Sequence, residues 1–236
     1  MILNEVDNIK VGDSDVDKVY IGDNLIWANY TYRQVEYIKS TGTQYITTDI
    51  IPSFTDRFVI DTKFSANTLT ATGGRVFGMS QSGGSLGVDI KNGSWGSYME
   101  VWFYMGFGWA SGQSNELHIS YSDVTNRVNI TLQHGVCYWG TNACSANYNI
   151  TMGTPTVGIA IFGTAAVQSD TSVNYIPLAY REMYLYSFKI YNGETLLHNL
   201  IPVERQSDGE LGLYDTLTDK FYGNAGTGTF EKGGYV

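Results

Sequence analysis

Aromatic residues gather within fifteen positions near the middle of the chain: Trp95, Tyr98, Trp102, Phe103, Tyr104, Phe107 and Trp109. If Met99–Met105 forms one strand, side-chain alternation places Glu100, Trp102 and Tyr104 on one face and the apolar residues on the other. Aromatic rings bind the apolar faces of pyranose sugars, and a polar neighbour takes the hydroxyl groups. We therefore choose Trp95, Trp102, Tyr104 and Trp109 as candidate glycan-binding residues. The competing interpretation is that Trp102 and Tyr104 pack beneath a loop or against a neighbouring subunit.

The sequence offers little for catalysis. Glycoside hydrolysis needs two carboxylates about 5–9.5 Å apart, and alternate positions of one strand would hold them on one face. Glu100 and Glu182 each stand in an aromatic strand without an acidic residue two or four positions away. The histidines His118, His134 and His198 accompany no Gly-x-Ser-x-Gly or His-Glu-x-x-His motif. We expect no catalytic residues and no enzyme activity.

A metal site is not expected either. Asp13, Asp15 and Asp17 have the spacing that opens an EF-hand loop, but its sixth position is Lys18 instead of Gly and its twelfth is Asn24 instead of Glu. We interpret this segment as a solvated acidic turn. Calcium held by loop oxygens elsewhere is an alternative that the sequence does not locate, and no cofactor is expected.

The two cysteines, Cys137 and Cys144, are too few for a disulfide scaffold. The six residues between them match no zinc or redox spacing. Two interpretations stay open: the pair closes a small loop when oxidised, or both are free thiols.

Short strands must position these residues. Apolar residues recur with a period of two or in β-branched runs over Arg57–Phe64, Met99–Met105, Arg127–Leu132, Thr156–Phe162 and Met183–Tyr191. Turn signals separate such runs: Ser82–Gly84, Lys91–Gly93, Asn192–Gly193 and Asp208–Gly209. No amphipathic helix of three turns is evident. We predict an all-β fold of two packed antiparallel sheets.

The first thirty residues differ from the rest. Ile9–Asp13 and Val19–Asp23 repeat one pattern, three strand-forming residues followed by Gly-Asp, and Leu25–Trp27 adds another short strand. A hairpin unit this small buries no core of its own and needs a partner surface. We expect residues 1–30 to form a β docking or oligomerisation element and residues 31–236 to form the main domain.

Composition narrows the function classes. The 236 residues are 43% hydrophobic and 16% charged, which suits a packed globular domain rather than a disordered chain. The net charge of −9 disfavours binding to the phosphates of nucleic acids. No run approaches the ~20 apolar residues of a membrane span, and the first residues lack the basic and apolar regions of a secretion signal.

The C-terminal fifty residues carry the most specific motifs: Tyr184–Gly193, Leu200–Arg205, Asp208–Asp215 and Lys220–Phe230. Together they resemble the closing strands of concanavalin A-like (laminin-G-like) jelly-roll domains of gut bacteria and their phages. Tyr37–Ile46 resembles the opening strand of the same family, so the likeness spans residues 35–230 with a divergent middle. It implies a two-sheet antiparallel jelly-roll sandwich, a fold that hosts lectins, hydrolases and structural modules.

Lys18–Trp27 is similar to a segment that opens many phage tail and virion appendage proteins. The two resemblances together imply a structural protein of a phage head or tail fibre, located on the particle. Its partners would be other virion proteins, sister chains in a homotrimer, and a host-surface polysaccharide. A bacterial surface carbohydrate-binding module or adhesin is the alternative, and a glycoside hydrolase is the third.

Overall fold

The computed structural model describes most of the chain. These are residues 9–11, 13–16, 18–21, 24–28, 31–65, 74–82, 84–92, 98–106, 116–133, 135–145, 154–177 and 182–236. Two of the four candidate glycan residues, Trp95 and Trp109, therefore lie outside the described residues, whereas Trp102 and Tyr104 lie inside them.

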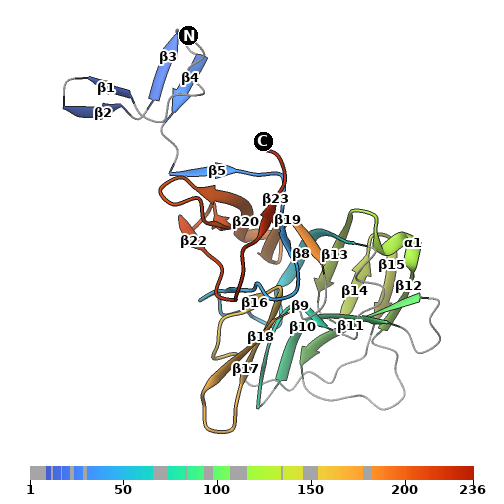
Figure 1. The fold of residues 1–236 in the computed structure, drawn as a ribbon. Coiled ribbons are helices and arrows are strands. Elements are labelled where there is room, and N and C mark those ends of the chain that lie inside the picture. Colours follow the sequence, from blue (N-terminus) through green and yellow to red (C-terminus); the bar gives the residue numbers. More distant parts are fainter. Residues whose placement is uncertain are drawn as a thin grey trace.

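The described residues form an all-β sandwich of two antiparallel sheets, consistent with a jelly roll (Figure 1). The eleven-stranded sheet has the central order β15-β14-β13-β8-β19-β20-β21-β22, with β5, β6 and β23 paired alongside. Its strands are β5 (Tyr32–Gln34), β6 (Ile38–Ser40), β8 (Arg57–Phe64), β13 (Val128–Gln133), β14 (Val136–Trp139), β15 (Asn142–Ser145), β19 (Met183–Asn192), β20 (Thr195–Arg205), β21 (Leu211–Asp215), β22 (Lys220–Tyr222) and β23 (Glu231–Lys232).

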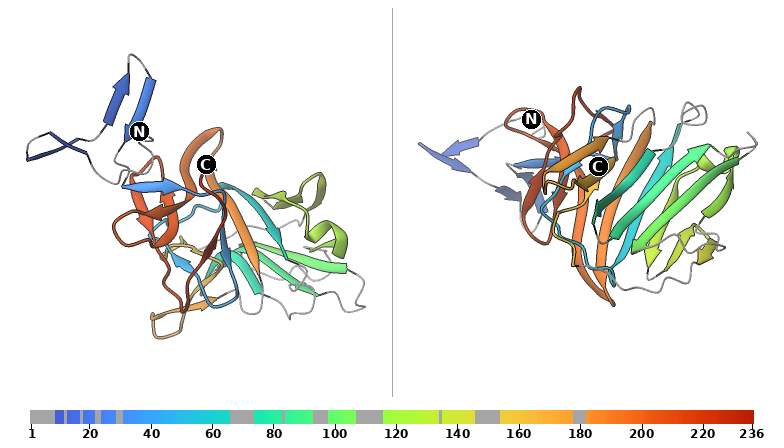
Figure 2. Two further views of the ribbon diagram at one scale, coloured as in Figure 1. Left: turned by 45° about the horizontal axis from the view of Figure 1, so that its top comes forward. Right: turned by 90° about the horizontal axis from the view of Figure 1, so that it is seen from below.

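The eight-stranded sheet, as described, has the order β12-β11-β10-β9-β16-β7, and the hairpin β17–β18 joins it through β9. The pairing of β17 with β9 is parallel, unlike its neighbours. The strands are β7 (Ile46–Thr47), β9 (Gly74–Gln81), β10 (Gly84–Asn92), β11 (Tyr98–Gly106), β12 (Glu116–Ser120), β16 (Ala160–Ile161), β17 (Gly163–Val167) and β18 (Val173–Pro177). In the turned views of Figure 2, β10 and β11 lie side by side.

The core lies between the two sheets, where apolar side chains at alternate strand positions meet. Phe77 of β9 packs against Phe58 of β8 at 5.4 Å and against Phe188 of β19 at 5.1 Å between ring centroids. All three rings are fully buried. Burying an aromatic side chain contributes a few kcal/mol, about 1.5–3 kcal/mol each. These rings therefore join the sheets into one unit.

Most predicted strands are confirmed. β8 covers the same residues as the predicted Arg57–Phe64, and its residues alternate between half-buried and buried. The prediction over Thr156–Phe162 is wrong, because regular pairing there is limited to β16. Phe162, with a φ of 59°, ends β16, and Gly158 approaches the backbone of Thr48 too closely for a Cβ.

The N-terminal residues that are described form two separate hairpins. β1 (Ile9–Val11) pairs with β2 (Ser14–Val16), and β3 (Lys18–Ile21) pairs with β4 (Asn24–Ala28). Both stand clear of the sandwich in Figures 1 and 2, and the chain then enters β5, which pairs with β20. The division into residues 1–30 and 31–236 stays a prediction.

Helix is nearly missing from the described part of the chain, where α1 spans only Tyr121–Val124. No helix among these residues is long and apolar enough to cross a membrane.

Candidate functional site

A hollow of about 370 Å³ opens on the outer face of the eight-stranded sheet, where β9, β10 and β11 meet the hairpin β17–β18. The lining combines aromatic, charged, hydroxyl and apolar side chains: Arg75, Ser80, Asp89, Lys91, Trp102, Tyr104, Thr164, Ala166 and Ile176, with Gly74. It is the setting of both described glycan candidates.

β11 places those two candidates as alternation predicts. Met99, Val101, Phe103 and Met105 are fully buried against the core, while Trp102 and Tyr104 are half-buried and line the hollow. Glu100 shares their face but is only 6% exposed and does not line the hollow. The predicted face is confirmed, and the side chains on it stay candidates for a ligand.

Lys91 ties Trp102 to Glu100. The Lys91 Nζ lies 3.0 Å from Glu100 Oε2 and 3.9 Å from the centroid of the Trp102 ring. The Trp102 Nε1–H donates to the same Glu100 oxygen at 2.9 Å. A buried carboxylate needs such a cation and donors, because an uncompensated buried charge is costly. The contacts hold the Trp102 ring in one orientation at the hollow.

Arg75 organises the other side of the hollow. Its Nε donates to Asp89 Oδ1 at 2.6 Å, its Nη1 donates to Thr164 Oγ1 at 3.2 Å, and its guanidinium lies 4.7 Å from the centroid of the Tyr104 ring. Burial first, and then the nearby Asp89 carboxylate, raise the pKa of Tyr104 to about 12. The Tyr104 hydroxyl therefore stays protonated well above neutral pH, and it hydrogen-bonds with Asp89.

A β-bulge brings Arg75 to this position. Phe77 pairs with Val88, and the next residue of β10, Asp89, pairs with Arg75, so Val76 is the extra residue. Val76 and Phe77 are both fully buried, and Arg75 turns outward. Bulges re-aim side chains in this way beside binding sites.

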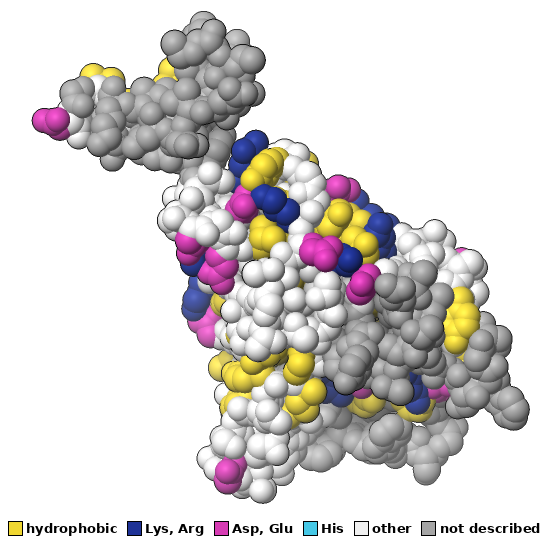
Figure 3. All heavy atoms as spheres, viewed as in Figure 1, with side chains coloured by type: hydrophobic (Ala, Val, Ile, Leu, Met, Phe, Trp, Pro, Cys, Tyr) yellow, Lys and Arg dark blue, Asp and Glu magenta, His cyan; other side chains and the backbone are white. Residues whose placement is uncertain are grey.

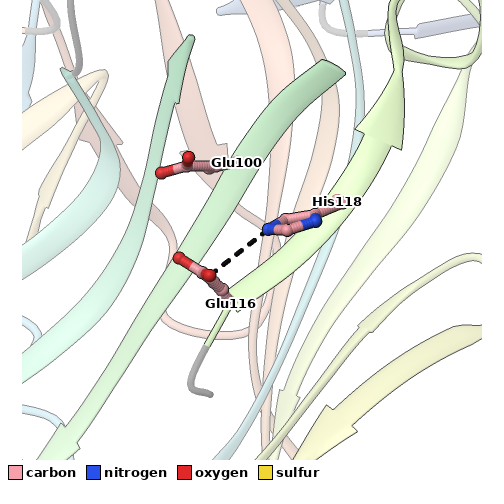
Figure 4. Close-up of side chains that lie close together, drawn as sticks. All are labelled: Glu100, Glu116 and His118. Atoms are coloured by element: carbon pink, nitrogen blue, oxygen red, sulfur yellow. Dashed lines mark hydrogen bonds and ion pairs between the residues drawn. The ribbon is translucent and has the colours of Figure 1, made fainter. Parts of the chain in front are cut away.

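A second cluster borders the hollow at the sheet edge (Figure 4). Glu100 on β11 pairs in register with His118 on β12, and Glu116 lies two residues before His118 on the same face. Ligand atoms of the three residues lie within 4.8 Å of one another, and His118 Nε2 lies 3.2 Å from Glu116 Oε1. One imidazole and two carboxylates suit a divalent transition metal, but Lys91 already neutralises Glu100.

The sequence analysis missed the polar half of the site. Asp89 and Lys91 are two residues apart on β10 and so share a face. This spacing could have been recognised in the sequence. Their partnership with Arg75 and Glu100 depends on strand register, which the sequence does not display. The wall from Thr164, Ala166 and Ile176 depends on where the β17–β18 hairpin docks.

The other described residues considered from sequence do not line the hollow. His198 Nδ1 lies 2.7 Å from Asp215 Oδ2. Burial would raise the pKa of Asp215, but hydrogen bonds from His198 and from backbone N–H groups lower it. Lys39 Nζ lies 3.3 Å from Glu182 Oε2. Asp13 is exposed. Asp17 and His134 lie outside the described residues, as does the side chain of Asp15.

The cysteines sit directly opposite each other in the β14–β15 hairpin, both as free thiols. Cys137 points into the core and is fully buried, whereas Cys144 is half-buried. Oxidation to close a small loop therefore needs no change of strand register.

Comparison with known proteins leaves the family open. No family model matches the chain, and no curated protein matches it. The resemblance to concanavalin A-like domains is accordingly an expectation from the quoted motifs, whereas the two-sheet sandwich is a property of the structure.

Proposed function

We propose that this chain is a non-catalytic phage virion protein whose sandwich binds a host-surface glycan in the hollow lined by Trp102 and Tyr104. The observation that carries the glycan part is the composition of the hollow. Two rings, two hydroxyl side chains and the Arg75–Asp89 pair converge on one open space. Sugars need both components, because they present apolar C–H faces and a rim of hydroxyl groups.

The fixed orientation of the side chains supports recognition. Arg75 is held by Asp89 and Thr164, and Trp102 is held by Glu100. Groups that are already ordered lose little conformational entropy when a ligand arrives. Such preorganised hydrogen-bonding groups can distinguish one arrangement of hydroxyls from another.

The same contacts argue against hydrolysis. A glycosidase needs one protonated carboxylic acid beside the scissile bond. Asp89 in the hollow and the buried Glu100 each form an ion pair with a cation. In our proposal these carboxylates orient Arg75, Lys91 and the ligand and take no part in proton transfer.

The virion assignment rests on the resemblances of Lys18–Trp27 and of the C-terminal motifs. Under this proposal, residues 1–30 attach the protein to other virion proteins or to sister chains, and a homotrimer would multiply weak glycan contacts. The described hairpins β1–β2 and β3–β4 pair only within themselves, which suits an element completed by a partner.

The glycan part is tested by Trp102→Ala on a panel of immobilised bacterial surface polysaccharides. We expect binding to fall at least about tenfold, the equivalent of the ~1.4 kcal/mol that an aromatic contact contributes. Tyr138→Ala is the matched control, because Tyr138 is 38% exposed on β14 of the other sheet. Equal binding by both variants would refute the hollow as the site. If Trp102→Ala unfolds, Tyr104→Ala in the same hollow provides the test, with a loss of binding again expected.

The location is tested by immunogold electron microscopy of particles from the source culture. We expect label at a fixed place on phage heads or tails. Label confined to bacterial envelopes would instead support the adhesin alternative. Loss of incorporation after deletion of residues 1–30, with the sandwich still folded, would support their docking role.

A further inference from the structure

The charges at the hollow are matched one to one. Arg75 pairs with Asp89 inside it, and Lys91 at its edge pairs with the buried Glu100. No other charged side chain lines the hollow among the described residues. Over the face seen in Figure 3, Lys and Arg side chains likewise lie beside Asp and Glu instead of gathering in a basic patch.

The guanidinium of Arg75 already has a partner for each nitrogen. Nε and Nη2 contact the two oxygens of Asp89 at 2.6 and 3.4 Å, and Nη1 contacts the Thr164 hydroxyl at 3.2 Å. The Arg75 side chain is only 15% exposed. Asp89 therefore occupies the two-point contact through Nε and Nη2, and a sugar carboxylate would have to compete with Asp89 or Thr164 for the guanidinium.

Lys91 is more exposed, at 40% of its side chain, but it is also paired with a carboxylate. Its Nζ balances Glu100, a carboxylate that is 6% exposed, and rests over the Trp102 ring. Moving Lys91 toward an anionic ligand would leave Glu100 buried without its cation, which is strongly unfavourable. Each cation is therefore already balanced by a carboxylate, so an acidic sugar finds no uncompensated positive charge in the hollow, and the Asp89 carboxylate repels it.

We infer that the hollow selects uncharged glycans and rejects glycans rich in uronic acids. This inference rests on the proposed function. Asp89 can accept hydrogen bonds from sugar hydroxyls, Thr164 and Ser80 offer hydroxyl groups, and Ile176 contributes an apolar wall. All of these suit a neutral sugar ring, and none requires breaking an ion pair.

The test uses polysaccharide pairs that share a backbone and differ only in whether C6 carries a carboxylate or an uncharged hydroxymethyl group. Alginate, pectate and hyaluronan are immobilised in their acidic and carboxyl-reduced forms, beside neutral bacterial polysaccharides, dextran and mannan. We expect the full-length protein to bind neutral members at least about tenfold more tightly than acidic ones, and Trp102→Ala to lose that binding. The binding of neutral members should change little with salt, because no net charge is neutralised.

Asp89→Asn sharpens the test. It frees the Arg75 guanidinium and leaves the hollow with one net positive charge, so we expect salt-sensitive binding of acidic members to appear. Asp61→Asn is the matched control, because Asp61 binds Arg127 through the same two-point contact, at 2.8 and 2.7 Å, on the eleven-stranded sheet. That control should leave the preference for neutral glycans unchanged.

The outcomes separate the two proposals. A preference of the unaltered protein for acidic members, lost in Trp102→Ala, would overturn the inference and leave the glycan function standing. Binding that ignores Trp102, or no binding across the panel, would overturn both. Because the unaltered protein decides the preference by itself, the test holds even if Asp89→Asn fails to fold.

Discussion

Arg75 on the eight-stranded sheet and Arg127 beside the eleven-stranded sheet form the same ion pair in different surroundings. Each contacts both oxygens of an aspartate, Asp89 or Asp61. Each guanidinium also lies over a tyrosine ring, at 4.7 Å for Arg75 and 3.8 Å for Arg127. The Arg75 side chain is 15% exposed, however, and the Arg127 side chain is 52% exposed.

The difference in exposure between the two arginine side chains comes from the hairpin β17–β18. β17 pairs with β9, so that Thr164 bonds to Arg75 and Ala166 helps to line the hollow, while Ile176 adds a wall from β18. Arg127 precedes β13, next to β8, and its salt bridge is open to water. The same side-chain types thus line a hollow on the first face and form an open surface pair on the second. What separates the two faces is how the hairpin encloses the residues.

The largest expected effect is on the alkylation rate of the two cysteines. Cys144 lies on β15, where the eleven-stranded sheet contacts β12 of the eight-stranded sheet. Burial first, and then Glu116 of β12, raise the pKa of Cys144 to about 12, and burial raises that of Cys137. Since only the thiolate reacts, alkylation of the native protein at neutral to mildly alkaline pH should be about a thousandfold slower than that of a free thiol.

Intact mass after iodoacetamide treatment, in buffer and in urea, measures this rate, and Cys144→Ser identifies the residue. Rapid labelling in buffer would mean that this side of the sandwich is more open than described. A disulfide-linked peptide in freshly isolated protein would favour the oxidised-loop interpretation of the cysteines.

The second-largest effect is expected on the free energy of unfolding, at Gly87 of β10 on the sheet that carries the hollow. Gly87 pairs with Tyr104 on one side and with Gly78 on the other. A Cβ at Gly87 would lie 2.2 Å from the Phe77 carbonyl oxygen and 2.9 Å from the Gly78 Cα. Gly87→Ala should therefore lower the free energy of unfolding by about 1–3 kcal/mol, as overpacking does.

Urea denaturation measures that loss. Gly234→Ala is the control, because a Cβ there meets nothing within 4 Å. If the two variants are equally stable, β9 and β10 are not packed as closely as the structure places them.

A smaller effect appears only at high pH. The pKa of Tyr104 is raised from 10.0 to about 12, so folding favours its protonated form. This contribution to stability is complete below pH 10 and is lost as the pH rises through 12. Tyr104→Phe should make stability less dependent on pH over that interval.

Urea midpoints over this interval test the prediction, with Tyr138→Phe as the control. A raised pKa of Tyr222 contributes in the same direction, so some dependence should persist in Tyr104→Phe. An unchanged profile in that variant would show that Tyr104 is not enclosed.

The smallest effect is expected for the exposed ion pair of Asp61 and Arg127 at the eleven-stranded sheet. A double-mutant cycle on Asp61 and Arg127, with alanine at each, should give a coupling of about 0.2–1 kcal/mol in urea denaturation, as exposed ion pairs do. The corresponding cycle on Asp89 and Arg75 should give a larger value, because that pair is better shielded from water. Equal coupling in the two cycles would remove the distinction between the faces.

Sequence reasoning reached the fold and part of the site. Period-two patterning located β8, β11 and β19, because each strand has one face in the core, and it placed Trp102 and Tyr104 on the opposite face of β11. Within one strand, alternation is a local property.

The rest of the site depends on pairing between strands. Glu100 appeared isolated in sequence, yet β12 brings Glu116 and His118 to it across the ladder. Strict alternation through β9 would also put Arg75 on the same side as Phe77, and only the bulge at Val76 reverses it. The choice of neighbouring strand and the bulge set these positions, and the alternation within a single strand reveals neither of them.

The bulge in β9 also bears on misfolding. If β9 slipped past β10 by one residue, every side chain would change face. The charge of Arg75 would then enter the apolar interior without Asp89, at a cost of several kcal/mol, while Phe77 would be exposed to solvent. The burial cost of the Arg75 charge thus disfavours the shifted alignment of β9 and β10 relative to the native one.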